Sequence, residues 1–124
     1  MPATELSPLG DVLDAWQLAI DAHQPERVAA LFTEDAVFQG LRPFSVGRPG
    51  VATYYAGQPA GMTVTYRLLE TRRLAGDVLL GWATADFTFA GPERAPVPVN
   101  LTVVLRRTAD GWRIAHYHAS PRIE

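Results

Sequence analysis

The chain of 124 residues contains no cysteine and no lysine. The absence of cysteine excludes disulfides, thiolate catalysis and cysteine-based zinc or iron–sulfur sites. All 11 cationic residues are arginines, and the formal net charge of −2 gives no basic footprint for binding nucleic acid. Arginine in place of every lysine, with frequent Ala, Gly and Pro, is typical of a GC-rich bacterial gene, so we expect a bacterial source.

The sequence also lacks long apolar runs. No apolar stretch approaches the roughly 20 residues that a membrane-spanning helix needs. Residues 1–5 lack the charged segment and apolar run of a signal peptide. We therefore expect a cytoplasmic protein that does not associate with membranes. The length predicts one domain over residues 1–124, with its core at about 8–121, and the 48% apolar content suits a packed interior.

Prolines mark the starts of three predicted helices in the first half of the chain. Ser7 and Pro8 precede apolar residues that recur at helical spacing, which is typical of a helix start. The predicted elements here are a helix over about 8–22, a helix opened by Pro25, a short strand over 36–39, a loop over 40–47 and a short helix over 49–57.

The second half is rich in Val, Thr, Leu and aromatic residues divided by turn-forming residues, which indicates consecutive strands. The predicted turns are Ala75-Gly76-Asp77, Gly91-Pro92 and Asp110-Gly111, and the predicted strands cover 63–74, 78–89, 97–107 and 112–119. Helices followed by consecutive strands predict an α+β fold, with three N-terminal helices packed on a strongly curved, mostly antiparallel sheet.

Alternation along these strands separates two faces of the sheet. One face is uniformly apolar and often small, so we expect it to face the helices around a pocket; a closed, filled core is the alternative. That face carries Leu79, Gly81, Ala83, Ala85, Phe87, Phe89, Val99, Leu101, Val103, Leu105, Ala115, Tyr117 and Ala119. The opposite face mixes Trp, Ile, Thr, His and Asn, and we expect it to join a second copy in a homodimer. The predicted interface residues are Trp82, Asp86, Trp112, Ile114, His116 and His118.

Aromatic side chains with a polar tip are predicted to approach the pocket, where they suit a ring-bearing small-molecule ligand. The predicted pocket-lining residues are Trp16, Phe38, Tyr54, Tyr55, Phe87, Val103 and Tyr117. Core packing with satisfied hydroxyls is the alternative for Tyr54 and Tyr117. Gln39 and His23 are further candidates to orient or polarise a substrate, and no residue is assigned as catalytic.

His116 and His118 lie two apart on one predicted strand, so both rings project from the same face. Such a pair could ligate a metal or act as acid and base. No third ligand is spaced to complete a metal site, so we predict no metal and no cofactor, and favour hydrogen-bonded interface histidines that would weaken the dimer when protonated. For Asp86, a general acid is the alternative to the favoured pairing with an arginine or a role at the interface.

Three strings, in this order and spacing, resemble the SnoaL-like, nuclear-transport-factor-2-like superfamily. They are LFTEDAVF at residues 31–38, GRPGVATYY at 47–55 and GWRIAHYHAS at 111–120. The resemblance runs from about Leu9 to Pro121, and the last string is most similar to the SgcJ/EcaC-type branch and to the association domain of calmodulin-dependent kinase II. It implies a cone-shaped, cystatin-like α+β barrel with a pocket between sheet and helices, usually as a homodimer.

The resemblance leaves the chemistry open, because this fold hosts isomerases, dehydratases, polyketide cyclases and non-catalytic hubs. The ketosteroid isomerases of the superfamily use an Asp base and an oxyanion hole of Tyr and Asp. The matching positions here are Trp16, Gln39 or Gly40, and Val103, so steroid-isomerase chemistry is not expected.

The arginines that line the pocket of the kinase association domain fall near Ala83 or Ala85, on Val103 and on Ala119, so the resemblance predicts no anionic site of that kind. Two hypotheses remain. The first is a pocket domain for a largely apolar or aromatic metabolite, with cofactor-free isomerisation, dehydration or cyclisation as its chemistry if it is an enzyme. The second is a non-catalytic oligomerisation or interaction module.

Overall fold

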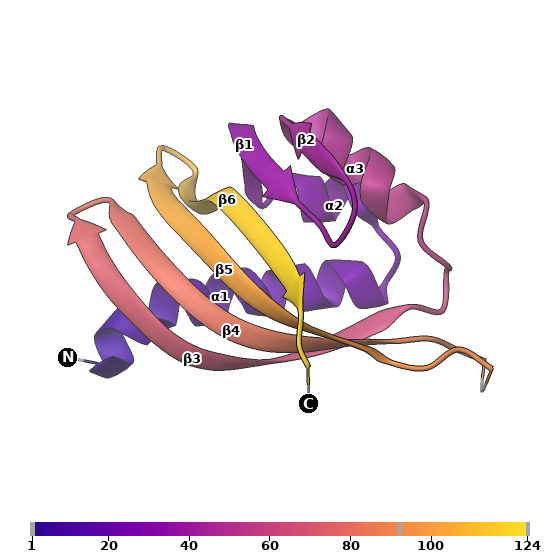
Figure 1. Ribbon diagram of the computed structural model, residues 1–124. Coiled ribbons are helices and arrows are strands. Elements are labelled where there is room, and N and C mark those ends of the chain that lie inside the picture. Colours follow the sequence, from indigo (N-terminus) through magenta and orange to yellow (C-terminus); the bar gives the residue numbers. More distant parts are fainter. Residues whose placement is uncertain (1, 92, 124) are drawn as a thin grey trace.

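Two helices, two strands and a third helix form the first part of the chain, and four long strands complete it (Figure 1). The computed structural model describes residues 2–91 and 93–123, with side chains from residue 8 onward. The elements are α1 (Pro2–Asp21), α2 (Pro25–Ala29), β1 (Phe32–Gln39), β2 (Phe44–Val46), α3 (Arg48–Ala56), β3 (Thr63–Ala75), β4 (Val78–Thr88), β5 (Val97–Thr108) and β6 (Gly111–Pro121). The predicted α+β class is confirmed. Part of the predicted turn Gly91-Pro92 lies outside the described residues.

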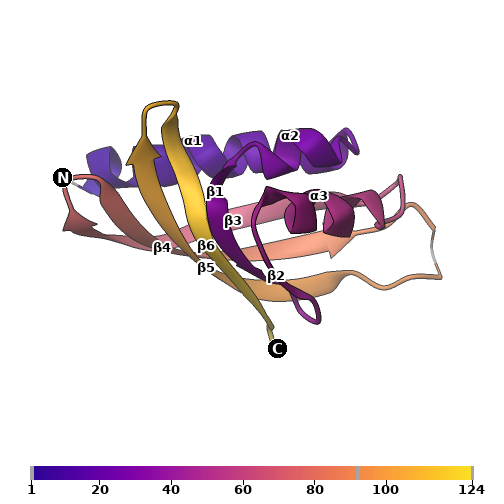
Figure 2. The same ribbon diagram turned by 90° about the horizontal axis from the view of Figure 1, so that it is seen from above.

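The strands form one six-stranded sheet in the order β2-β1-β6-β5-β4-β3. Neighbouring strands are antiparallel except β1 and β6, which run parallel, so the sheet is mixed but mostly antiparallel. The long strands bend strongly, and α1 crosses one face of the sheet (Figure 1). Seen from above, α2 and α3 lie together at one end of the molecule (Figure 2). The helices therefore cover one face and one end of the sheet.

Helix α1 begins at Pro2, earlier than the predicted start, and Pro8 lies inside it. Proline suits the first turn of a helix, so Pro2 can begin this longer helix, whereas Pro8 gives up one backbone hydrogen bond. The helix buries Leu9, Val12, Leu13, Trp16 and Ile20 against the sheet. The approach is close: a Cβ on Gly81 of β4 would lie 2.7 Å from Leu9 Cδ2. Glycine at this position lets the helix lie directly on the strand.

Strand β2 falls in the segment predicted to be a loop. It pairs with β1 through Val37 and Val46, Phe38 and Ser45, and Gln39 and Phe44. A strand of three residues is too short to show an alternating pattern in the sequence, which is why it was not predicted. Strand β1 also begins at Phe32, four residues before its predicted start. Its first half does not alternate regularly between buried and exposed residues, and its register with β6 shifts between Phe32 and Val37, so no strand pattern is visible in the sequence there.

The predicted faces of β4 and β5 are confirmed. Along β4 every second residue is buried, and these are Leu79, Gly81, Ala83, Ala85 and Phe87. Along β5 the buried residues are Val99, Leu101, Val103 and Leu105. The core lies between this inner face and the helices. In the described part of the chain, no helix combines the length and the apolar composition needed to cross a bilayer.

A β-bulge in β6 reverses part of the predicted pattern. Val104 pairs with His116 and Leu105 pairs with Ile114, so Ala115 is an extra residue in β6. Residues that precede the bulge therefore lie on the opposite face from the one that regular alternation predicts. Ile114, for example, is fully buried in the core. Trp112 also packs against the core. The assignment of Ile114 and Trp112 to the outer face was therefore wrong, and Ala115 is only partly buried.

Candidate functional site

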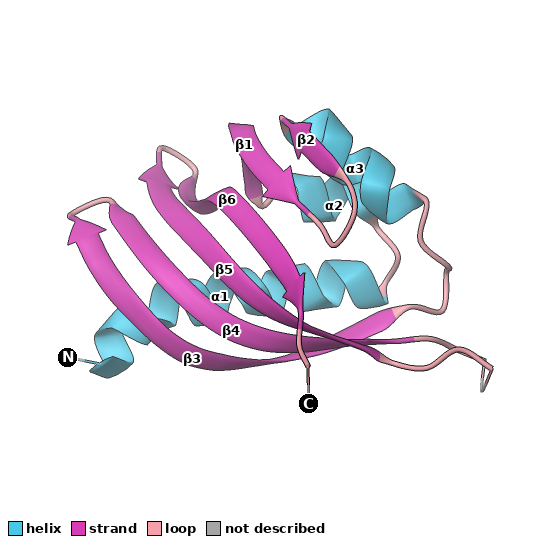
Figure 3. Ribbon diagram, viewed as in Figure 1, coloured by secondary structure: helices cyan, strands magenta, loops and turns pink. Residues whose placement is uncertain are grey.

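A pocket of about 400 Å³ is lined by residues of the β1–β2, α3–β3 and β4–β5 loops and of the inner face of the sheet. Figure 3 shows these loops in pink. Its walls are apolar and aromatic and include Tyr54, Phe87, Phe89, Val97, Val99 and Tyr117. The longer, mostly polar side chains around it are Arg42, Gln58, Met62 and Arg94. This size, and apolar walls with few polar groups, are typical of small-ligand sites.

The aromatic wall is supported from behind by buried rings. The rings of Phe38 and Tyr117 stack at 4.8 Å with an interplanar angle of 14°. Tyr54 contacts Phe38 at 5.2 Å between ring centroids, and Trp16 meets Phe87 edge-on at 6.0 Å. Aromatic pairs at these separations restrict each other's orientation. The wall of the pocket is therefore well ordered.

The predicted pocket residues divide into two layers. Tyr54, Phe87 and Tyr117 line the pocket. The other four do not border this pocket and are packed in the core; they are Trp16, Phe38, Tyr55 and Val103. Their assignment to the pocket lining was wrong. They do point inward, but strand and helix periodicity gives the face of a residue and not its depth, and neighbouring side chains fill the space around them.

Three buried polar groups form a short network behind the pocket. Trp16 Nε1 donates a hydrogen bond to the Tyr55 hydroxyl at 3.3 Å. Burial raises the pKa of Tyr117 and Tyr55 well above the usual value, and the neighbouring hydroxyl groups of the two residues also influence each other's pKa. Burial also raises the pKa of Tyr54, although the charge of Arg94 opposes that shift. All three phenols therefore stay protonated near neutral pH and act as hydrogen-bonding groups, not as bases.

Gln39 and His23 do not reach this pocket, which corrects their assignment as substrate-orienting groups. Gln39 faces the outer side of β1, where its Nε2 donates to the carbonyl oxygens of Gly40 at 2.9 Å and Pro43 at 3.2 Å. His23 follows α1 with φ of 53°, the left-handed conformation common at helix C-termini. It borders a separate cavity of only about 10 Å³.

The loop residues of the pocket were not predicted. Arg42 comes from the β1–β2 loop, Gln58 and Met62 from the α3–β3 segment, and Arg94 from the β4–β5 loop. Loops carry no periodicity, so nothing local in the sequence indicates that these segments converge. Their one shared sequence feature is that each adjoins an element with inward-facing aromatic residues.

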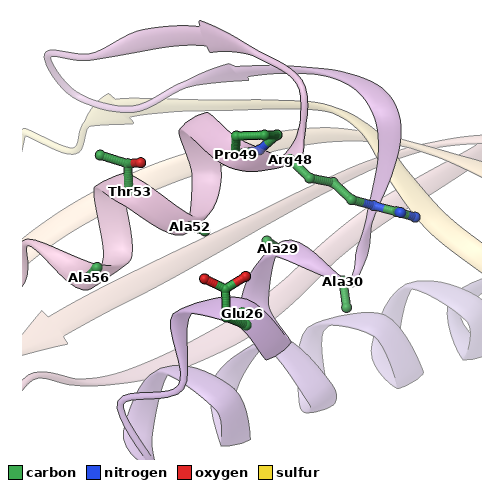
Figure 4. Close-up of a pocket in the computed structure, with 8 residues that line it drawn as sticks. All are labelled: Glu26, Ala29, Ala30, Arg48, Pro49, Ala52, Thr53 and Ala56. Carbon is green, nitrogen blue, oxygen red and sulfur yellow. The ribbon is translucent and has the colours of Figure 1, made fainter.

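A second hollow lies between α2 and α3 (Figure 4). It is an open groove of about 480 Å³, lined largely by alanine side chains. Arg48 Nε donates to the Phe32 carbonyl oxygen at 2.8 Å, which ties the start of α3 to β1. Figure 4 shows the side chains of Glu26 and Arg48 extending in different directions. The groove therefore lacks convergent polar groups, and the loop pocket is the better candidate site.

The outer face of the sheet carries the remaining predicted interface residues. Trp82 and Asp86 are partly exposed, and Asp86 Oδ1 forms an ion pair with Arg122 at 2.7 Å, as favoured from the sequence. The rings of His116 and His118 lie 6.2 Å apart between centroids. Among the described residues, no group of three or more metal-ligating side chains surrounds this pair.

Residues 9–124 match the model of the SnoaL-like domain family. The chain belongs to this family. The resemblance seen in its three strings is therefore confirmed. A comparison with curated proteins gave no significant match for this SnoaL-like domain.

Solved structures share the fold of this SnoaL-like domain. A Nostoc punctiforme domain with a cystatin-like fold has a TM-score of 0.85 at 15% identity, over 100% of this chain and 81% of that one. A candidate dehydratase of the NTF2-like family from Streptomyces avermitilis has a TM-score of 0.78 at 24% identity, over 100% of both chains. A candidate calcium/calmodulin-dependent protein kinase type II association domain from Thiobacillus denitrificans has a TM-score of 0.76 at 26% identity, over 92% and 94%. The cystatin-like fold is confirmed, and the varied names of these structures leave the chemistry open.

Proposed function

We propose that this SnoaL-like domain, acting as one domain, binds a small, largely apolar or aromatic metabolite in the loop pocket without a cofactor. The observation that carries the proposal is the ordered aromatic wall of Tyr54, Phe87 and Tyr117, which borders a pocket of about 400 Å³ while the rest of the inner face is filled. Rings with polar tips bind flat ligands by stacking and supply hydrogen bonds at the edge.

Binding is better supported than proton-transfer catalysis. Isomerisation, dehydration and cyclisation need a group that accepts a proton. Among the described residues, the pocket lining includes neither a carboxylate nor an imidazole. The raised pKa values of Tyr54 and Tyr117 keep these phenols neutral. Dehydration, the activity named for the Streptomyces avermitilis relative, would here depend on polarisation by neutral hydroxyls and arginine side chains, without a group to accept the proton.

A thermal-shift screen with aromatic and polyketide-like metabolites tests the proposal. A ligand that binds only the folded chain, present at about 100 times its Kd, should raise the unfolding midpoint by roughly 10 °C. Val97→Trp fills the pocket from a half-buried position and should abolish the shift. Leu18→Trp, at a 70% exposed position on α1, is the control and should retain it. Equal shifts in both variants would place the ligand elsewhere and contradict the proposal.

A second function, oligomerisation, has its own support on the outer face of the sheet. Leu80, Trp82 and Val104 are only partly buried there, and Phe44 and Val46 at the β2 edge are 62% and 63% exposed. An apolar surface spread over several strands is typical of an interface. We propose that this face forms a homodimer, which is compatible with a ligand in the pocket because the two sites lie on opposite sides of the sheet. The cytoplasmic location expected from the sequence remains a prediction.

A further inference from the structure

We propose that the ligand of the loop pocket is an acid, specifically an aromatic or apolar carboxylate whose head group lies at the pocket mouth with Arg42 and Arg94. The inference rests on the proposed function and narrows it from apolar metabolites in general to their carboxylates. The resemblance to the kinase association domain predicts no arginine site, since Ala and Val occupy the matching positions. The two arginines found here come from different segments, namely two loops.

Arg94 is held at the pocket by its aromatic neighbours. Its guanidinium carbon lies 3.8 Å from the centroid of the Phe89 ring, a cation–π contact. Its charge also reaches the hydroxyl of Tyr54, because it opposes the upward shift that burial gives the Tyr54 pKa. Among the described residues, no protein partner is found for that hydroxyl. Arg94 and Tyr54 therefore offer a cation and a hydrogen-bond donor to the same part of the pocket.

Arg42 approaches from the opposite loop, whose shape is set by backbone contacts. Gly40 N donates to the Pro43 carbonyl oxygen at 2.9 Å, and Gln39 Nε2 donates to the same oxygen at 3.2 Å. These bonds close the turn from residue 40 to 43, and Arg42 in this turn borders the pocket. A rigid turn reduces the entropy lost when its side chain orders around a ligand.

The positive charge at the mouth is not balanced within the described part of the chain. No carboxylate lines the pocket there, and neither Arg42 nor Arg94 forms an ion pair with a described residue. By contrast, Arg72 pairs with Glu70 at 2.8 Å. Glu93, the nearest acid in sequence to Arg94, does not line the pocket. Two uncompensated cations beside an apolar cavity favour a ligand that is anionic at one end and apolar at the other.

A carboxylate fits this arrangement better than a phosphate. The planar fork of a guanidinium matches the two oxygens of a carboxylate. Phosphate sites commonly add backbone N–H groups from a glycine-rich loop or from the start of a helix. Here the N–H of Gly40, the glycine of the β1–β2 loop, already donates to Pro43. The mouth thus offers side-chain cations, and the aromatic walls offer space for a hydrocarbon ring.

Calorimetric titration with matched probes tests the inference. The probes are 2-naphthoate, its neutral isostere 2-naphthamide and 2-naphthyl phosphate. We expect 2-naphthoate to bind about tenfold more tightly than 2-naphthamide at low salt, and this advantage to shrink as added salt screens the charges. Arg94→Gln and Arg42→Gln should each weaken naphthoate binding about threefold to tenfold and leave naphthamide binding unchanged. Arg107→Gln, an exposed residue of β5 remote from the pocket, is the control and should change neither.

The outcomes separate this inference from the proposed function. Equal affinity for naphthoate and naphthamide, unchanged in both arginine variants, would overturn the acid assignment and leave the apolar pocket intact. Tighter binding of the naphthyl phosphate than of naphthoate would overturn the choice of carboxylate. If neither naphthoate nor naphthamide binds the wild-type chain at millimolar concentration, the proposed function fails together with the inference.

Discussion

Tyr54 and Tyr55 are neighbours in α3, yet their hydroxyl groups have different surroundings. The Tyr55 oxygen accepts a hydrogen bond from Trp16 in the core, and the Tyr55 side chain is 3% exposed. The Tyr54 ring borders the pocket. Successive helical residues point about 100° apart, so one tyrosine can support the core while the next faces a ligand. We therefore expect the Tyr55 phenol to contribute to stability and the Tyr54 phenol to contribute to the proposed binding of a ligand.

Replacing each tyrosine by phenylalanine tests this division. Tyr55→Phe removes the acceptor for the buried Trp16 Nε1 donor and should lower the free energy of unfolding by about 1–3 kcal/mol. Tyr54→Phe removes no described protein contact and should change it by less than about 0.5 kcal/mol. It should instead weaken the binding of a pocket ligand that accepts a hydrogen bond. Urea unfolding measures the free energy of unfolding of each variant. Equal losses of stability in Tyr54→Phe and Tyr55→Phe would contradict the different roles of the two hydroxyl groups.

At the scale of elements, the bulge at Ala115 decides what each face of β6 presents. It lets Ile114 and Tyr117 both point to the core although an odd number of positions separates them. It also keeps His116 opposite Val104 and His118 opposite Thr102 on the outer face. Without the extra residue, regular alternation would turn either Ile114 or Tyr117 away from the core. The bulge thus joins two segments whose alternation is out of phase.

Deleting one residue from β6 or, in a second variant, one residue from β5 tests the role of the bulge. Removal of Ala115 leaves Ile114 directly before His116, which restores regular pairing, so this variant should fold with a loss of roughly 1–3 kcal/mol. Removal of Val104 from β5 instead moves one half of that strand to the opposite face, and should prevent cooperative folding. Thermal unfolding followed by circular dichroism compares the two. A deletion of Ala115 as damaging as that of Val104 would refute this account.

At the scale of the whole molecule, the parallel contact of β1 with β6 brings the N-terminal half against the last strand. This contact places the β1–β2 loop beside the β4–β5 loop and so forms the mouth of the pocket. It also extends the outer face across the sheet from β3 to β2. The proposed ligand pocket on one side of the sheet and the proposed dimer face on the other therefore depend on the same contact between β1 and β6.

The proposed homodimer is tested by placing charge on the outer face. Trp82→Glu puts a carboxylate at the centre of that surface and should convert a dimer to a monomer, because an unpaired charge is costly to bury in an interface. Leu18→Glu changes a 70% exposed residue of α1 and should leave the dimer intact. Light scattering coupled to size-exclusion chromatography gives the mass of each. A wild-type chain that runs as a monomer at micromolar concentration would refute the dimer.

Local sequence patterns predicted the elements and most of the faces. The four long strands lie within one or two residues of their predicted bounds, because alternation and turn residues are local signals. The same alternation placed Phe87 and Tyr117 on the inner face, and both reach the pocket. It failed for Trp112 and Ile114, because a bulge of one residue leaves no mark on an otherwise regular pattern.

The sequence by itself determined the α+β class and the SnoaL-like family. It also determined which side of β4 and β5 faces the helices. Each of these properties depends on patterns within short segments. Only the tertiary structure decided which inward side chains are core and which line a pocket, because depth depends on what packs above each residue. It also decided that Arg42 and Arg94 share one pocket mouth. Loops distant in sequence meet only after the sheet has closed, and no local pattern encodes that meeting.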